Sequence, residues 1–187
     1  MSRQDQSRLD TPTPHGALYT TIGKYLPDLI FGANDGIITT LAVVSGVVGA
    51  RLSTTVILIL GFANLVADGF SMGASNVLSR RSNPQSDALP TLTAAAPYGI
   101  ATFIGFIAAG IVPLLAYLLP WFADARFAAA MALALATLFA VGASRAFFTG
   151  RGWLPSGLEM LLIGAFAAGV AYGIGALGAA IIGNTSP

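Results

Sequence analysis

The sequence contains no cysteine and very few charged side chains. Without cysteine, the 187-residue chain can form neither disulfides nor thiolate metal sites, and it has no cysteine nucleophile. Charged residues make up 9% of the chain, whereas soluble domains carry roughly 25%. The net charge of +1 gives no reason to expect nucleic-acid binding. Water is therefore not the main solvent of this chain, and an integral membrane protein is expected.

Long apolar segments account for most of the sequence. Hydrophobic residues make up 55% of it, and the mean hydropathy is +0.76. A helix needs about 20 apolar residues to cross a bilayer, and five stretches qualify: 28–50, 54–79, 97–119, 123–148 and 157–183. We predict an all-α integral membrane protein in which residues 28–183 form five transmembrane helices. Residues 1–27 are predicted to be a polar, interfacial N-terminal segment.

The basic residues predict how the spans are oriented, because short cytoplasmic loops keep an excess of Lys and Arg. Only Arg51 and Arg126 fall on the side opposite to the N-terminus. The others fall on the N-terminal side: Arg3, Arg8, Lys24, Arg80, Arg81, Arg145 and Arg151. This places the N-terminus in the cytoplasm and, after an odd number of spans, the C-terminus outside.

Three pairs of glycines have the spacing at which helices pack closely in lipid. They are Gly32 with Gly36, Gly69 with Gly73, and Gly169 with Gly173. Such pairs can join helices within one chain or between two chains, and the sequence leaves both alternatives open.

Two carboxylates lie well inside the predicted spans, Asp35 in the first and Asp68 in the second. A carboxylate at mid-helix costs about 2.5–3.5 kcal/mol on insertion scales, so such residues usually mark pathways. The bodies of the five predicted spans contain no Lys, Arg or His near either acid. Asp35 and Asp68 are therefore expected to be protonated or to meet cations that arrive from solution, and both alternatives suit a transporter.

Depth and helical spacing bring further side chains to these acids. From the cytoplasmic helix ends, the rise per residue places Asp35 about 13 Å deep, Asp68 about 16 Å and Met72 about 10 Å. Asp68 and Met72 share a polar stripe of the second helix with Asn64. A polar stripe cannot face lipid, so it must face protein or a water-filled cavity. Asp35, Asp68, Met72 and Asn64 are the predicted metal ligands.

Each of these residues also has a structural explanation. Asp35 could cap a local helix break at residues 34–36, and Asn64 could serve only as an interhelical hydrogen-bonding residue. Met72 alone would be assigned to core packing, and Glu159, at the start of the fifth span, is read as structural. A membrane scaffold or sensor with structural aspartates is the alternative to a transporter. An intramembrane aspartyl protease is disfavoured, because neither aspartate lies in a Gly-x-Gly-Asp pattern, so no enzymatic activity is expected.

The predicted ligand set indicates the class of cation. Carboxylate and amide oxygens favour hard divalent ions, and a thioether adds softness. The combination suits Fe²⁺, Mn²⁺ or Co²⁺ better than Zn²⁺, which usually recruits His or Cys. Carboxylates must lose protons to bind metal, so proton–metal exchange is the natural coupling. The metal is substrate here, and no resident cofactor is expected.

Four segments resemble those of the vacuolar iron transporter family. Residues 28–50, DLIFGANDGIITTLAVVSGVVGA, are similar to its first-helix signature, and residues 61–76, GFANLVADGFSMGASN, to its second. Residues 106–115, FIAAGIVPLL, and 157–172, GLEMLLIGAFAAGVAY, resemble its third and fifth helices. The resemblance extends from about Asp28 to Gly178.

The resemblance implies a homodimer in a lipid bilayer that exports Fe²⁺ or Mn²⁺ from the cytosol in exchange for protons. The ion path would lie at the dimer interface, lined by Asp35 as the first-helix aspartate and Met72 as the second-helix methionine. Asn64 occupies the place where plant members have a glutamate, and the carboxylate appears one turn later as Asp68.

The linker at 80–96 departs further from the family. Well-studied members carry a glutamate-rich helical domain there that gathers cytosolic metal, whereas this linker holds Asp87 as its only acid. We therefore expect a short form without cytosolic metal capture, or one that leaves this task to a partner protein. Small size and short loops suggest, by analogy, a bacterial-type inner membrane.

Overall fold

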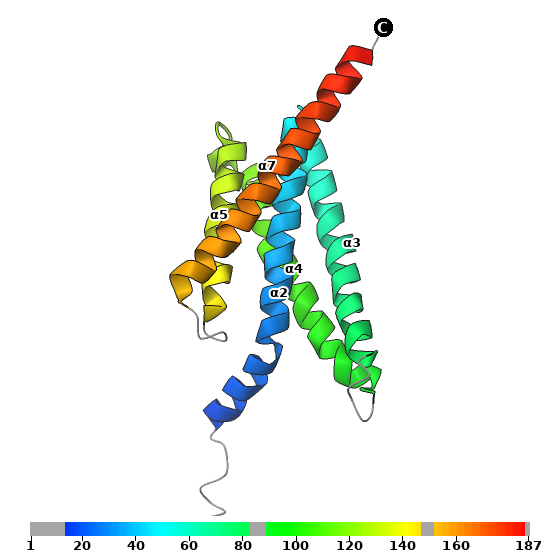
Figure 1. Ribbon diagram of the computed structural model, residues 1–187, viewed down its shortest axis with the longest axis vertical. Coiled ribbons are helices and arrows are strands. Elements are labelled where there is room, and N and C mark those ends of the chain that lie inside the picture. Colours follow the sequence, from blue (N-terminus) through cyan, green and yellow to red (C-terminus); the bar gives the residue numbers. More distant parts are fainter. Residues whose placement is uncertain (1–13, 83–88, 147–151, 186–187) are drawn as a thin grey trace, which may run out of the picture.

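The computed structural model describes residues 14–82, 89–146 and 152–185, and in these ranges it is entirely helical (Figure 1). The long helices are α2 (Pro14–Gly49), α3 (Thr54–Arg81), α4 (Leu92–Leu118), α5 (Arg126–Ser144) and α7 (Trp153–Thr185). A short 3-10 helix, η1 (Pro120–Phe122), lies between α4 and α5. All five long helices are long and apolar enough to cross a membrane, which confirms the predicted fold class.

The helix ends differ from the predicted spans where apolar and polar sequence meet. Helix α2 begins at Pro14, within the segment predicted to be polar and interfacial, and α4 begins at Leu92 rather than at 97. Helix α3 continues to Arg81, past the predicted end at 79. The predicted end of the fourth span, at 148, lies outside the described residues. Hydropathy locates the apolar part of a helix but does not register a polar last turn.

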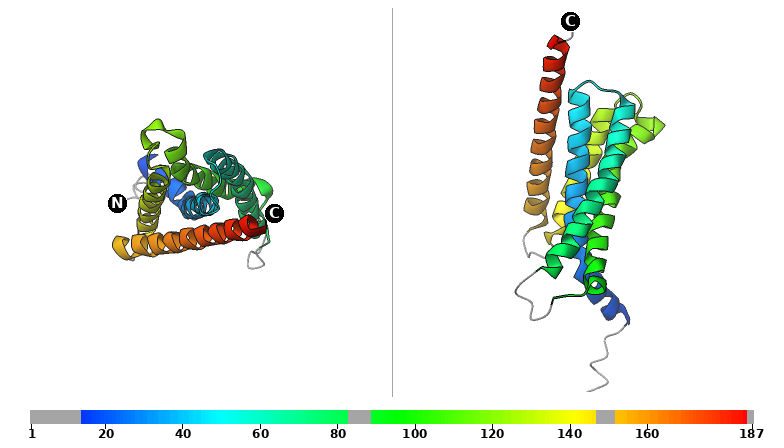
Figure 2. Two further views of the ribbon diagram at one scale, coloured as in Figure 1. Left: turned by 90° about the horizontal axis from the view of Figure 1, so that it is seen from above. Right: turned by 90° about the vertical axis from the view of Figure 1, so that its right-hand side faces the viewer.

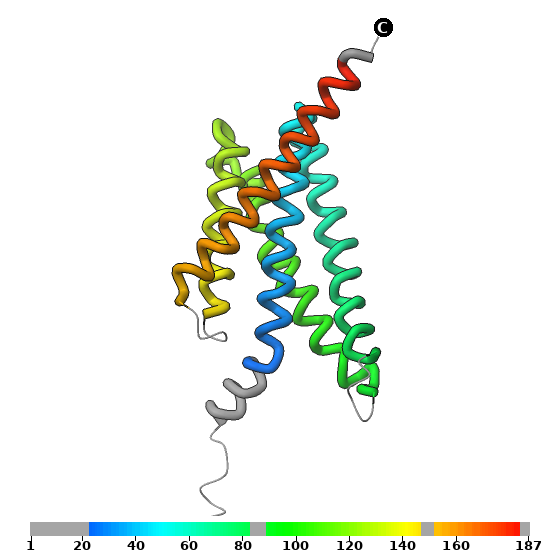
Figure 3. Tube along the Cα trace, in the orientation of Figure 1, coloured from blue at the N-terminus to red at the C-terminus, as the bar shows by residue number. Residues whose placement is uncertain are grey.

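Helix α2 is the centre of the bundle, with the other four long helices around it (Figure 2). A short turn at Ala50–Ser53 joins α2 to α3, and Arg51 in this turn has a φ of 58°. The trace in Figure 3 shows that the turn leaves α2 and α3 side by side and antiparallel. Helix α4 packs against both of them, so α2, α3 and α4 form one three-helix unit.

Glycines allow α2 and α4 to pack with their backbones in contact. A Cβ at Gly32 would overlap the carbonyl of Thr102, and one at Gly105 would overlap the carbonyl of Leu29. Gly36 likewise faces the backbone of Phe106. The first predicted glycine pair therefore joins helices within the chain.

The other two glycine pairs behave differently from each other. Gly69 and Gly73 of α3 lie against α4, so this pair too is intramolecular. A Cβ at Gly169 or Gly173 of α7 would meet nothing within 4 Å in the described part of the chain. The outer face of α7 therefore has room for a neighbour, and the question of a contact between two chains stays open for this pair.

Candidate metal site

A cavity of about 550 Å³ lies between α2 and α3 and contains three of the four predicted ligands. Asp35 enters it from α2, and Asp68 and Met72 enter it from α3. Its remaining lining is mostly polar and consists of Asp28, Phe31, Ser71, Ser75, Asn76 and Ser79. The polar stripe of α3 thus faces a cavity, as the cost of exposing it to lipid requires.

Asp35 lies on an unbroken helix. Residues 34–36 are helical along with the rest of α2, so the alternative of a helix break capped by Asp35 is wrong. The Thr39 hydroxyl donates to the backbone carbonyl of Asp35 at 2.9 Å, which leaves the Asp35 carboxylate to the cavity. Helical geometry, rather than a loop, therefore sets the direction of this side chain.

Neither Asp35 nor Asp68 has a cationic partner within ion-pair distance among the residues that the structure describes. The two carboxylates line the same cavity, where two negative charges would repel each other. Both are only partly buried, so water or a cation can reach them. A divalent cation between them would remove the repulsion and supply the charge that both side chains lack.

Met72 lies one turn from Asp68, and Asn64 lies one turn away on the other side. The Met72 side chain packs against the core cluster and also reaches the cavity. Asn64 lies outside this cavity and donates to the Thr39 hydroxyl of α2 at 3.4 Å. It lines a second, largely apolar cavity of about 490 Å³ together with Gly46 and Leu60.

The contact between Asn64 and Thr39 separates these two cavities. The first reaches from the level of Ser79 to that of Asp35 and Asp68, and the second begins beyond them. The structure therefore brings Asp35, Asp68 and Met72 together in the first cavity and places Asn64 outside it, in the lining of the second. The interhelical hydrogen bond expected for Asn64 is present. The role of Asn64 as a metal ligand stays a prediction.

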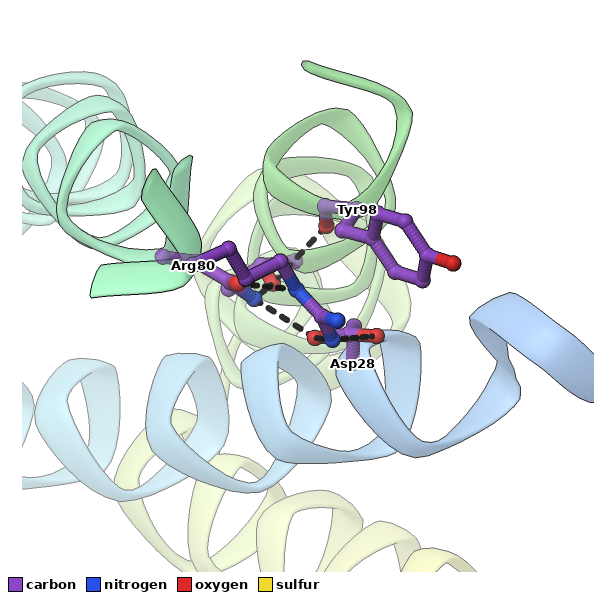
Figure 4. A network of polar contacts seen from close by, with 5 residues as sticks. Asp28, Arg80 and Tyr98 are labelled. Carbon is purple, nitrogen blue, oxygen red and sulfur yellow. Dashed lines mark hydrogen bonds and ion pairs between the residues drawn. The ribbon is translucent and has the colours of Figure 1, made fainter. Parts of the chain in front are cut away.

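A polar network that the sequence does not predict lies at the end of the cavity lined by Asp28, Asn76 and Ser79 (Figure 4). The Arg80 Nη2 atom donates to both carboxylate oxygens of Asp28, at 2.8 and 2.9 Å. Asn76 donates to Asp28 and to the Thr102 hydroxyl, both at 2.6 Å. The Arg80 guanidinium also stacks on Tyr98, 3.7 Å from the ring centroid. The network joins α2, α3 and α4.

Two signals in the sequence point to this network. Asn76 and Arg80 are four residues apart, so they share a helix face once α3 extends that far. Asp28 precedes Asp35 by two helical turns and shares its face. The sequence does not predict the network because hydropathy ends the second span at 79 and leaves Arg80 in the linker, whereas α3 continues to Arg81.

A further cavity of about 410 Å³ reaches Asp35 from the side of α5 and α7. Asn34, Arg145 and Met160 are among its lining residues, and Arg145 donates to the Met160 sulfur at 3.4 Å. Glu159, on the neighbouring turn of α7, is exposed and lines none of these cavities.

The donor set suits a hard to intermediate divalent cation. Three carboxylates, one of which (Asp28) is paired with Arg80, line the cavity together with one thioether and three serine hydroxyls. Among the described residues, no three or more His, Cys, Asp or Glu side chains are grouped so that they could hold a metal ion by themselves.

A sequence model of the VIT family matches residues 26–89 and 84–176. Together these segments cover well over half of the chain and include at least part of each of the five membrane helices. The chain belongs to the VIT family. The match divides at the connection between α3 and α4, where this member has its short linker.

Relatives in plants and parasites bear names that agree with this assignment. The "Vacuolar iron transporter homolog 1" of Oryza sativa subsp. japonica is 31% identical over 181 residues, covering 85% of this chain and 76% of the relative. The "Vacuolar iron transporter 1" of Arabidopsis thaliana is 24% identical, covering 84% of this chain and 88% of the relative. The "Vacuolar iron transporter" of Plasmodium falciparum (isolate 3D7) is 45% identical over 65 residues, covering 35% of this chain and 24% of the relative.

The length of these alignments agrees with a short form of the family. The alignment with the Arabidopsis thaliana protein extends over 219 positions, although this VIT-family member has 187 residues. The relative therefore has segments that this chain lacks. Asp87, the acid of the short linker, lies outside the described residues.

Proposed function

We propose that this VIT-family protein transports Fe²⁺ or Mn²⁺ out of the cytosol, in exchange for protons, with Asp35, Asp68 and Met72 as ligands. The observation that carries this proposal is a pair of carboxylates that line one cavity with a thioether and have no ion-pair partner among the residues that the structure describes. The names of the relatives support iron as a substrate, and the hard oxygen donors support manganese equally.

The proposed path enters at the level of Ser79 and reaches the carboxylates through the hydroxyls of Ser75 and Ser71. All three serines are exposed in the isolated chain. A polar, exposed face of a membrane helix must meet water or protein, so we propose that a second copy covers this face and completes the path. The ion would then pass Asn64, which lies beyond the carboxylates in the second cavity.

Proton exchange follows from the same carboxylates. Asp35 and Asp68 bind metal only after losing their protons, so metal affinity falls as protons become more available. We propose that protons from the opposite side release the metal and return on the emptied carboxylates. We also propose that the N-terminus lies in the cytoplasm, as the basic residues predict, and, by analogy from the small size and short loops, that the home membrane is a bacterial-type inner membrane.

Uptake into proteoliposomes tests the proposal. We expect the protein to move Fe²⁺ and Mn²⁺, and a pH dye in the lumen to report proton flux that starts with metal addition. Asp35→Asn and Asp68→Asn should each reduce uptake by at least about a hundredfold, since each removes a charge from a site with two. Asp124→Asn, the same change at an exposed position in the turn before α5, serves as the matched control.

Three results would count against parts of this proposal. Normal uptake in the Asp35 and Asp68 variants would remove the site assignment. Uptake without any proton flux would remove the exchange mechanism. If the inserted and assembled wild-type protein moves no metal at all, the scaffold or sensor becomes the better explanation.

A further inference from the structure

An ion pair between α2 and α3 lies beside the cation cavity, because Asp28 lines the cavity and is paired with Arg80, which does not line it. Asp28 and Asn76 line the cavity between Ser79 at the rim and the carboxylates further in. Arg80 holds Asp28 through both carboxylate oxygens, at 2.8 and 2.9 Å. An ion that enters along the serine hydroxyls from Ser79 would therefore reach Asp28, whose carboxylate is already paired with Arg80, before it reaches Asp35 or Asp68.

The two partners of this pair differ in how they are held. Asp28 is 8% exposed, and Asn76 donates to it from a position fixed by the buried Thr102 hydroxyl. The side chain of Arg80 is 38% exposed and lies on the last turn of α3. If the pair separates, Asp28 stays in place, whereas Arg80 has water to move into.

We propose that Arg80 and Asp28 form a latch across the mouth of the cation cavity, which an entering divalent cation opens by replacing Arg80 as the partner of Asp28. Arg80 and the cation would use the same two carboxylate oxygens, so their binding is mutually exclusive. Asp28 thereby becomes an entry site, and Arg80 sets the metal concentration at which this site fills. The inference rests on the proposed transport function and adds a control point to it.

The contacts of Arg80 explain why the latch closes again. Its Nε atom donates to the Asn76 oxygen at 3.0 Å, and its guanidinium lies on the Tyr98 ring. Both contacts remain available while the ion occupies Asp28, because neither uses the carboxylate. Once the ion moves on, the unpaired buried carboxylate attracts the nearby guanidinium back.

The dependence of Mn²⁺ uptake on Mn²⁺ concentration tests the latch in the reconstituted full-length protein. Arg80→Gln removes the competitor, so we expect the KM for Mn²⁺ to fall about fivefold or more, the effect of a unit charge a few ångströms away. Asp28→Asn leaves the guanidinium at the mouth without its carboxylate, so the KM should rise. In the double variant Asp28→Asn/Arg80→Gln, the fall in KM that Arg80→Gln causes alone should disappear.

Arg81→Gln is the matched control, since Arg81 is the exposed neighbour on the same helix turn. It removes the same charge and should leave the KM close to that of the wild type. If Arg80→Gln fails to insert, Arg80→Lys keeps the charge but loses the two-oxygen contact and the stacking, and it should still lower the KM.

Opposite shifts in the two single variants separate a latch from a clamp that only holds the fold. If both variants raise the KM or reduce uptake alike, the pair is structural and the latch is wrong. The latch is also wrong if Arg80→Gln matches Arg81→Gln. Both outcomes require a wild-type protein that transports Mn²⁺; a wild-type protein that moves neither Mn²⁺ nor Fe²⁺ instead contradicts the proposed function.

Discussion

At the scale of single residues, the cavity between α2 and α3 contains one soft donor among oxygens. Met72 reaches the lining beside Asp68, while Phe31 is the other large apolar residue there. A thioether binds Fe²⁺ and Co²⁺ better than Mn²⁺, which prefers oxygen ligands. Met72 therefore bears on which metal the protein selects, whereas the two carboxylates bear on whether it binds a divalent cation at all.

Met72→Leu tests this division of roles. The substitution keeps the volume and should cost less than about 1.5 kcal/mol of stability. We expect Fe²⁺ uptake to fall by roughly tenfold relative to Mn²⁺ uptake, the effect of about 1.4 kcal/mol of lost binding. The measurement is competition between the two ions during uptake into proteoliposomes.

Met131→Leu is the control for Met72→Leu, because Met131 packs against a core cluster and lines none of the cavities around Asp35. It should leave the ratio of Fe²⁺ to Mn²⁺ uptake unchanged. An unchanged ratio in Met72→Leu as well would mean that the thioether does not contact the metal.

At the scale of elements, the contact between α2 and α4 holds Asp35 and Asp28 in position. Backbone meets backbone there, since a Cβ at Gly105 of α4 would overlap the Leu29 carbonyl of α2. Gly105→Ala should therefore force the helices apart and destabilise the protein by about 1–3 kcal/mol. A lower midpoint of thermal unfolding in detergent, followed by the loss of the folded peak in size-exclusion chromatography, measures the effect.

Gly169→Ala provides the comparison on α7, where a Cβ meets nothing within 4 Å in the described part of the chain. Its midpoint should stay close to that of the wild type. Equal losses in the two variants would show that helix flexibility, rather than close packing, is the reason for the glycines.

The sequence predicted the helices and the proximity of Asp35, Asp68 and Met72, because both depend on local rules. Apolar length sets the spans, and the rise per residue gives Asp35, Asp68 and Met72 a common depth. Asn64 shares the face of Asp68, yet it lies beyond the cavity, because the contact with Thr39 joins α2 and α3 at that level. Such a contact depends on how two helices are rotated against each other, which no pattern within one helix determines.

The ion pair between Asp28 and Arg80 shows the same limit. It joins residues 52 positions apart on different helices, and it forms only because α3 continues to Arg81. A polar last turn has no hydropathy signal, so the sequence placed Arg80 in a linker. Long-range pairs between helix ends are therefore the part of a membrane site that is hardest to predict from one sequence.

At the scale of the whole molecule, the orientation of the chain in the membrane decides which side the cation cavity faces. The lining of the cavity extends along α3 to Ser79, next to Arg80 and Arg81 at the end of the helix. The excess of basic residues predicts that this end faces the cytosol, so the cavity would receive metal from the cytosol. The opposite orientation would turn the same cavity into an exit.

Single cysteines can establish the orientation, since the chain has none of its own. Ser53→Cys lies in the exposed turn between α2 and α3, and Ser82→Cys lies at the exposed end of α3. In intact cells, a membrane-impermeant maleimide should label Ser53→Cys and leave Ser82→Cys unlabelled until the membrane is permeabilised. The cysteine-free parent controls for background. The reverse pattern would place the cavity mouth outside and make this protein an importer, and labelling of both sites in intact cells would show that the two turns do not lie on opposite sides.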